Sequence, residues 1–263
     1  MPLRRILAIL LVCGLAGGTT SAQPGADVTS FQVLRIEPSA RTAALGGSYA
    51  AVADGDVNAL FFNPAIPGPA TSRVASASYL NHLSDLNLGS VAYSHTVRGL
   101  GTTFHGGLRF SHWGTFEGRD RYGNPTGDFG AGTAVLTVGG ARPLGARVRY
   151  GANLHLMHAR IERAGAAAIA LDLGGLYRVP SRRLAVGVSL RHLGGMVDGF
   201  GDTREPLPLD LQVGVSKRLA HLPLLLTATA YDLTNLSEGI NGGGTVDHVL
   251  GHLTMGAELQ PGD

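Results

Sequence analysis

Oxygen-bearing side chains with the spacing of a calcium loop are the first candidates for chemistry in this sequence. Asp54, Asp56 and Asn58 occupy the first three ligand positions of such a loop. The loop also needs a turn glycine and a final bidentate acid, but Ala59 and Ala65 stand at those positions. We therefore predict that these residues form a hydrogen-bonded turn and hold no metal.

Histidine pairs are the second candidates. His155 and His158 are three residues apart, so on a strand their side chains point to opposite faces. His248 and His252 share a face, but at ~3.3 Å per residue they lie ~13 Å apart. Neither pair makes a metal site without other ligands, and we interpret both as polar packing in the interior.

Motifs for cofactor binding and catalysis are incomplete. Two Gly-x-Gly pairs, beginning at Gly99 and Gly130, lack the third glycine and the strand-to-helix context of a dinucleotide fingerprint. The sequence has no Gly-x-Ser-x-Gly elbow, and a hydrolase built inside a barrel would need a serine and a histidine on adjacent strands. We predict no catalytic residue, no cofactor and no enzymatic activity.

The first residues have the pattern of a secretory signal, which we place at 1–22. Arg4 and Arg5 provide the positive start, and the apolar stretch 6–14 is too short to span a bilayer as a stable helix. Cys13, the single cysteine, lies within that stretch. The exported chain is therefore expected to have neither a disulfide nor thiol chemistry.

The composition favours strands that face lipid. Without the two signal arginines, 19 basic residues balance 19 acidic ones, so nothing indicates nucleic-acid binding. Charged residues make up only 15%, and there are 39 glycines. No segment after the signal has the ~20 apolar residues of a transmembrane helix, which leaves a closed barrel as the way to cross a membrane.

Ten segments alternate between apolar and polar residues, as strands with two different faces do. In the third, Leu108 and Phe110 share one face, and Arg109 lies on the other. We assign the polar faces to the interior; they carry Arg109, Asn153, Asp210 and Gln212. The predicted strands are 74–80, 87–96, 102–112, 129–141, 147–160, 166–179, 183–194, 208–219, 223–233 and 247–259. The fifth loses its alternation near 157–162, which predicts a bulge or a departure from the bilayer.

The connections between these strands alternate between long and short, as in outer-membrane barrels with long extracellular loops. The longest are 113–128, 195–207 and 234–246. Exposed aromatic and arginine side chains favour partner interfaces. The candidate partner-binding loop residues are Phe116, Arg119, Tyr122, Phe200 and Arg204.

Two stretches carry a family resemblance. The first, 39–65, reads SARTAALGGSYAAVADGDVNALFFNPA; the second comprises 207–218 and 227–233. Together they resemble the FadL-like superfamily of outer-membrane barrels and, within it, the PorQ branch of the PorV/PorQ family of the type IX secretion system. The resemblance implies an N-terminal hatch at 23–73 and a barrel at 74–263. The hatch motif consists of Ser39, Arg41, Gly46, Gly47, Asp56, Asn58, Asn63 and Pro64. We expect Gly46 or Gly47 to have a positive φ.

The resemblance also implies a function. In this family the barrel lies in the outer membrane and, with PorU, PorV and PorZ, forms a complex that attaches cargo to surface lipopolysaccharide; the PorQ branch docks PorZ. The family has fourteen strands, so we expect about four C-terminal strands to be missing, and closure with ten strands is the alternative. The rival functions are a FadL-like transporter of hydrophobic molecules, a PorV-type cargo shuttle and a barrel hydrolase.

Overall fold

The computed structural model describes residues 30–81, 85–201, 204–234 and 250–260. The expected signal, most of the loop 234–246 and the start of the tenth predicted strand lie outside these residues. No helix in the described part of the chain has the length and apolar character to span a membrane.

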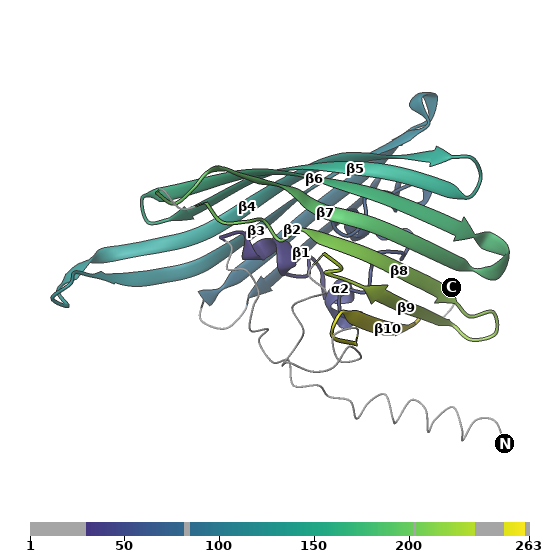
Figure 1. Cartoon of the computed structure of the whole chain (residues 1–263). Helices are drawn as coiled ribbons and strands as arrows, with labels where there is room; N and C mark the ends of the chain where they lie inside the picture. The colour runs from purple at the N-terminus through teal and green to yellow at the C-terminus, as the bar shows by residue number, and fades with distance from the viewer. Residues whose placement is uncertain (1–29, 82–84, 202–203, 235–249, 261–263) are drawn as a thin grey trace, which may run out of the picture.

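The protein is all-β, and the strands of its described residues form one antiparallel sheet of ten strands in sequence order. Each strand therefore pairs with its neighbours along the chain (Figure 1). The strands are β1 (Val74–Asn81), β2 (Asn87–Val97), β3 (Thr102–Arg119), β4 (Pro125–Leu144), β5 (Val148–Ile161), β6 (Ala164–Val179), β7 (Leu184–Asp198), β8 (Asp210–Arg218), β9 (Leu224–Ala230) and β10 (Leu253–Leu259). The prediction of ten strands is confirmed, with shifted ends.

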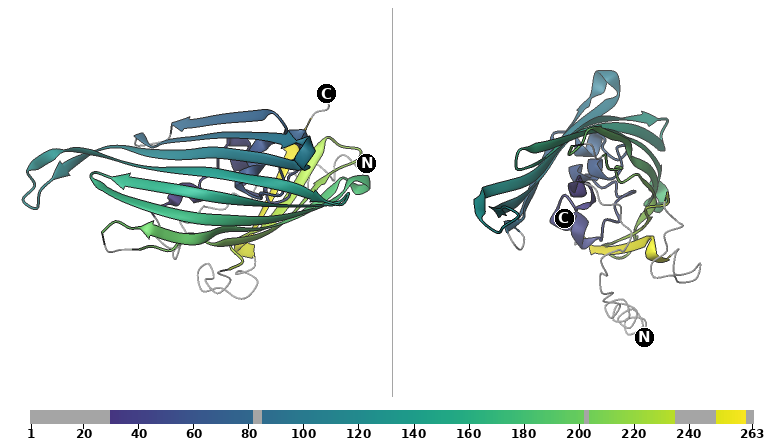
Figure 2. Two further views of the ribbon diagram at one scale, coloured as in Figure 1. Left: turned by 90° about the horizontal axis from the view of Figure 1, so that it is seen from above. Right: turned by 60° about the vertical axis from the view of Figure 1, so that its left-hand side comes forward.

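The sheet curves around the N-terminal segment, residues 30–73, which lies against its concave face (Figure 2). The segment contains short helices: η1 (Gln32–Arg35), α2 (Ala40–Ala44), η2 (Val57–Phe61) and η3 (Pro69–Thr71). Two more short helices, η5 (Arg98–Leu100) and η6 (Pro180–Arg182), connect strands. Within the described ranges no pairing joins β10 to β1, so closure into the expected barrel is not shown.

The two faces of the sheet are inverted relative to those of a water-soluble protein. On β3, the Leu108 side chain is 40% exposed on the convex face, while Arg109 is 2% exposed on the concave face. On β8, Val213 and Val215 are exposed and Gln212 is buried. The predicted interior positions of Arg109, Asn153 and Gln212 are confirmed, and Asp210 is half-buried. The protein thus presents a broad apolar surface outward, which soluble monomers rarely do.

Three local predictions need correction. Residues 113–128 are not a loop, because β3 and β4 continue as a paired hairpin to Arg119 and Pro125. The predicted bulge in β5 is absent, since β5 keeps one register with both neighbours through Ile161; the alternative, that the strand leaves the bilayer there, stays a prediction. Irregularities occur instead in the β3–β4 and β6–β7 pairings. The tenth strand begins at Leu253, because the residues just before it form a helical turn.

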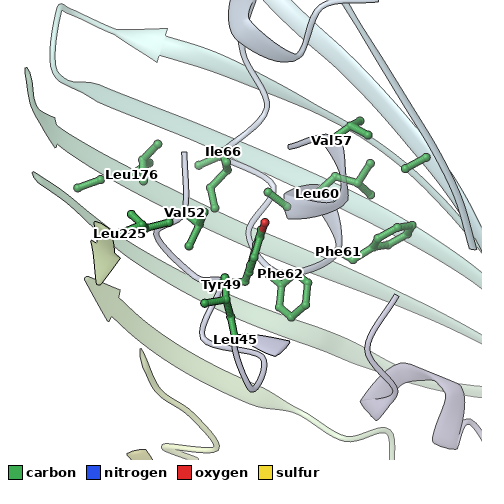
Figure 3. Close-up of a cluster of buried hydrophobic side chains, with 14 residues drawn as sticks. Leu45, Tyr49, Val52, Val57, Leu60, Phe61, Phe62, Ile66, Leu176 and Leu225 are labelled. Atoms are coloured by element: carbon green, nitrogen blue, oxygen red, sulfur yellow. The ribbon is translucent and has the colours of Figure 1, made fainter. Parts of the chain in front are cut away.

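The apolar core lies between the N-terminal segment and the concave face (Figure 3). Tyr49, Leu60 and Phe61 of the segment are almost completely buried there, with Leu176 of β6 and Leu225 of β9. A second cluster packs Phe31 and two residues of η1, Val33 and Leu34, against β4, β5 and β6. Most of the buried side chains of the first cluster belong to the segment, whereas most of those of the second belong to the strands.

Candidate functional site

Asn63 fixes the N-terminal segment to the sheet. Its side chain is fully buried, and its Nδ2 lies 2.8 Å from Ala50 O, 3.1 Å from Gly175 O and 3.3 Å from Val188 O. Its Oδ1 accepts a hydrogen bond from Ala65 N at 2.9 Å. One amide thereby joins two parts of the segment to the backbones of β6 and β7, and Pro64 is buried beside it.

Glycines in the strands allow this close approach. A Cβ on Gly174 would lie 2.9 Å from Pro64 Cδ, and a Cβ on Gly187 would lie 3.0 Å from Asn63 Nδ2 and closer still to Ala50 O. Any side chain at these positions would push the segment off the concave face. The Asn-Pro-Ala motif and the strand glycines are therefore two halves of one contact.

Arg41 joins the segment to the last strand. Its guanidinium donates to Glu258 of β10 at 2.9 and 2.6 Å and to Asp54 at 2.5 Å, and it lies 3.3 Å from Asp56. Burial works against the charged form, but the carboxylates raise the pKa of Arg41. Burial alone would raise the pKa of Asp54, and the bond to Arg41 holds it below its ordinary value.

This ion-pair network explains the calcium-like spacing. Asp56 Oδ1 caps η2 by accepting from Asn58 N at 2.9 Å, and Asp56 Oδ2 accepts from the Tyr49 hydroxyl at 2.6 Å. Burial and this carboxylate raise the pKa of Tyr49. Since Asp56 accepts hydrogen bonds from Asn58 within this stretch, the prediction of a hydrogen-bonded turn is confirmed.

The remaining motif residues shape the start of the segment. Ser39 caps α2, accepting from Thr42 N through its hydroxyl at 3.3 Å. Gly46 and Gly47 both have positive φ, at 62° and 73°, as predicted. A Cβ on Gly47 would also lie 2.7 Å from Glu37 Oε1. The motif is thus a compact series of turns that ends at the Asn63 contact.

Beneath the segment lies a chain of buried polar side chains that sequence reasoning did not assemble. Asp172 Oδ2 is 2.6 Å from His155 Nε2 and accepts from Asn153 Nδ2 at 3.1 Å. His155 Nδ1 is 2.9 Å from Thr137 Oγ1, and Asn153 Oδ1 is 2.8 Å from His105 Nε2. This chain crosses β3, β4, β5 and β6.

His192 joins this chain through a bulge. Arg191 and His192 of β7 both oppose Asp172 of β6, so both point inward; His192 has φ 58°. The Asp172 Oδ1 accepts from His192 N at 2.8 Å, and His192 Nδ1 is 3.0 Å from Pro208 O. With strict alternation along β7, the His192 side chain would point outward. Of these three residues, therefore, only Asp172 and His155 could be placed on the inward face from the sequence alone.

The chemistry of this cluster is limited by its hydrogen bonds. His155, Asp172 and His192 each have a potential metal-ligand atom, and these three atoms lie within 4.8 Å of one another. Small movements of the side chains could bring them to coordination distance of one metal ion. Asp172 Oδ2, however, already accepts from Asn153 and His155. Thr137 and His155 are fully buried, which hides this Thr-His-Asp series from any substrate. We interpret the cluster as the polar counterpart of the apolar core.

The predicted loop residues lie at the opposite end of β3 from η5. Phe116 stacks on Phe129 at 5.5 Å between ring centroids and is 42% exposed; Tyr122, at the tip, is 75% exposed. Arg119 donates to Glu117 at 3.0 Å and to Gly123 O at 3.1 Å. These residues belong to one ordered hairpin.

Phe200 and Arg204 lie apart from the hairpin tip. Phe200 is half-buried and Arg204 is exposed. Phe200 lines a mostly apolar pocket of about 370 Å³ with Val33 and the aromatic residues at the hairpin base, Trp113, Phe116 and Phe129. The structure thus joins Phe116 and Phe200 in one pocket, and leaves Arg119, Tyr122 and Arg204 outside it.

When the chain is compared with protein-family models and with curated proteins, no family model and no curated protein matches it.

Proposed function

We propose that this protein is an outer-membrane component of the type IX secretion system. In this proposal it is a PorQ-like member of the PorV/PorQ family that anchors a PorZ-type partner. The role is non-enzymatic: the sheet holds the protein in the membrane and the hairpin of β3 and β4 recognises the partner. PorU and PorV-type proteins would complete the complex at the lipopolysaccharide surface.

The observation that carries the membrane part is the inverted sheet. Its convex face exposes side chains such as Leu108, Val188 and Val213, and its concave face buries Arg109 and Gln212. Strands of an outer-membrane barrel have this arrangement, with apolar side chains toward lipid. The packed N-terminal segment would then be the hatch. A filled interior favours a protein that anchors a partner over one that transports a molecule through the sheet's interior.

The observation that carries the partner part is the shape of the hairpin. It reaches beyond the other strands on the left of Figure 1, and its exposed side chains include Phe116, Arg119 and Tyr122. Hydrogen bonds from Tyr122 N and Asn124 N to Asp120 Oδ1, at 2.8 and 2.9 Å, order its tip. A preordered aromatic tip loses little conformational entropy on binding.

The test shortens the hairpin without disturbing the sheet. Glu117 and Asp128 are paired, so replacing residues 118–127 with Asn-Gly closes the hairpin by a two-residue turn. We expect the partner and the anchored surface proteins to appear in the medium, while the shortened protein stays in the outer-membrane fraction. Alanine substitutions at Arg98 and Leu100 of η5, at the far end of β3, are the control and should release nothing.

A FadL-like transporter is the second candidate, favoured by the apolar pocket at the hairpin base. Trp113, Phe116, Phe129 and Phe200 could hold a hydrocarbon chain there. A gene deletion separates the two functions. Normal anchoring of surface proteins together with lost uptake of fatty acids or hydrocarbons would overturn the secretion proposal and establish the transporter.

A further inference from the structure

A second cavity, of about 290 Å³, lies between the N-terminal segment and strands β3, β7 and β8. Its volume is near the lower end of the ~300–1,000 Å³ that small-molecule sites occupy. Glu37 and Gly46 line it from the segment, and Arg109, Arg191 and His192 line it from the sheet. It is separate from the apolar pocket at the hairpin base.

The two arginines are buried with unused hydrogen-bond donors. Arg109 is 2% exposed; its one hydrogen bond reaches Leu34 O at 3.5 Å, and its Nε and Nη2 have no partner among the described residues. Arg191 is 7% exposed; it lies 3.5 Å from Asp210 Oδ2, and its Nε is likewise without a partner there. Buried charged donors left unpaired cost considerable free energy.

Aromatic rings hold both guanidinium groups in place. Arg109 Cζ lies 5.0 Å from the centre of the Phe61 ring, and Arg191 Cζ lies 5.6 Å from that of Phe62. Both rings come from the end of η2 in the N-terminal segment. One face of each guanidinium group is thus covered by an aromatic ring.

Arg191 has one long ion pair in the cavity, with Asp210 Oδ2 at 3.5 Å. The same oxygen also accepts from Gln212 Nε2 at 2.5 Å, and Asp210 Oδ1 accepts from Asp232 N at 2.7 Å. Glu37 Oε2 is buried without a hydrogen-bond partner in the described part of the chain. Burial raises the pKa of Glu37, and the charges of Arg191 and Arg109 act in the opposite direction.

We propose that this cavity binds a small oxyanion, a phosphate or carboxylate group, between Arg109 and Arg191. The guanidinium groups of these two lining residues form charge-assisted hydrogen bonds with its oxygens, and arginine suits this role because its planar fork matches such groups. This site is independent of the proposed secretory role.

The test is calorimetric titration of the full chain in detergent with sodium phosphate and with sodium acetate, at constant ionic strength set by chloride. We expect at least one of the two to bind saturably at one site. Arg109→Gln and Arg191→Gln should each weaken that binding about tenfold or more, because each removes charged hydrogen bonds. Glu37→Gln should bind at least as tightly as wild type, since it removes a repulsive charge.

Arg149→Gln is the matched control. Arg149 is also partly buried, but it donates to Ile66 O at 2.6 Å and Pro67 O at 3.2 Å, away from the cavity. It should leave anion binding unchanged. If a glutamine variant does not fold, Arg109→Lys and Arg191→Lys keep the charge and should still bind more weakly, because lysine lacks the fork.

Three results would overturn the proposal. The first is that neither phosphate nor acetate binds to the wild-type protein. The second is that the Arg149 variant weakens binding as much as the Arg109 and Arg191 variants do. The third is that decanoate binds while acetate and phosphate do not, which would make the cavity an apolar site.

Discussion

Replacing Asn63 with alanine should release the N-terminal segment from the sheet. The Nδ2 group donates its two hydrogens to the carbonyl oxygens of Ala50, Gly175 and Val188, at 2.8, 3.1 and 3.3 Å. Oδ1 accepts from Ala65 N at 2.9 Å. The side chain is fully buried. Alanine therefore removes about three hydrogen bonds and leaves their backbone partners without them.

The size of the effect follows from these lost bonds. A buried polar group left without a partner costs about 1–3 kcal/mol. Water entering the space vacated by the Asn63 side chain would restore part of this. We therefore expect the free energy of local opening to fall by about 2–4 kcal/mol, which accelerates amide hydrogen exchange roughly 30- to 700-fold.

Hydrogen exchange measured by mass spectrometry on the detergent-solubilised protein provides the assay, read from peptides that cover η2 and Ala65. Asn87→Ala is the control, because Asn87 also hydrogen-bonds to Tyr79 and Asp85 but does so in solvent. It should change exchange by less than about threefold. An Asn63→Ala segment that exchanges within threefold of wild type would refute the anchoring role.

Two further predictions concern the same interface. Gly187→Val should destabilise the protein by about 1–3 kcal/mol in thermal unfolding, because the new Cβ would collide with Ala50 O. The control is Gly195→Val in the same strand, which has open space around its Cβ and should have little effect. Arg41→Gln should lower the melting temperature at pH 6. The ionised Asp54 contributes stability above its unfolded pKa of about 3.9 and loses it as the pH falls through its lower folded pKa, so the difference from wild type should narrow towards pH 3. A difference that stays constant with pH would argue against this linkage.

Local patterns predicted the strands and their faces. A period of two depends only on neighbouring residues, so Leu108 outward and Arg109 inward could be read directly from the sequence. The same holds for the positive φ of Gly46 and Gly47, since glycine is the residue that adopts it at no steric cost. The hairpin of β3 and β4 was missed because its charged, glycine-rich sequence also fits a loop.

Contacts between distant segments were decided by the tertiary structure. Arg41 and Glu258 are 217 residues apart, and no local pattern indicates that they meet. His192 points inward only because a bulge places it and Arg191 opposite Asp172, which reverses the alternation of β7 from that point. The contacts of Arg109 with Phe61 and of Arg191 with Phe62 likewise join the sheet to the distant N-terminal segment. The sequence by itself determined which side chains face inward along regular strands, because that is a local property of the backbone. Which of them meet depends on how the sheet curves around the N-terminal segment, and that is a property of the whole fold.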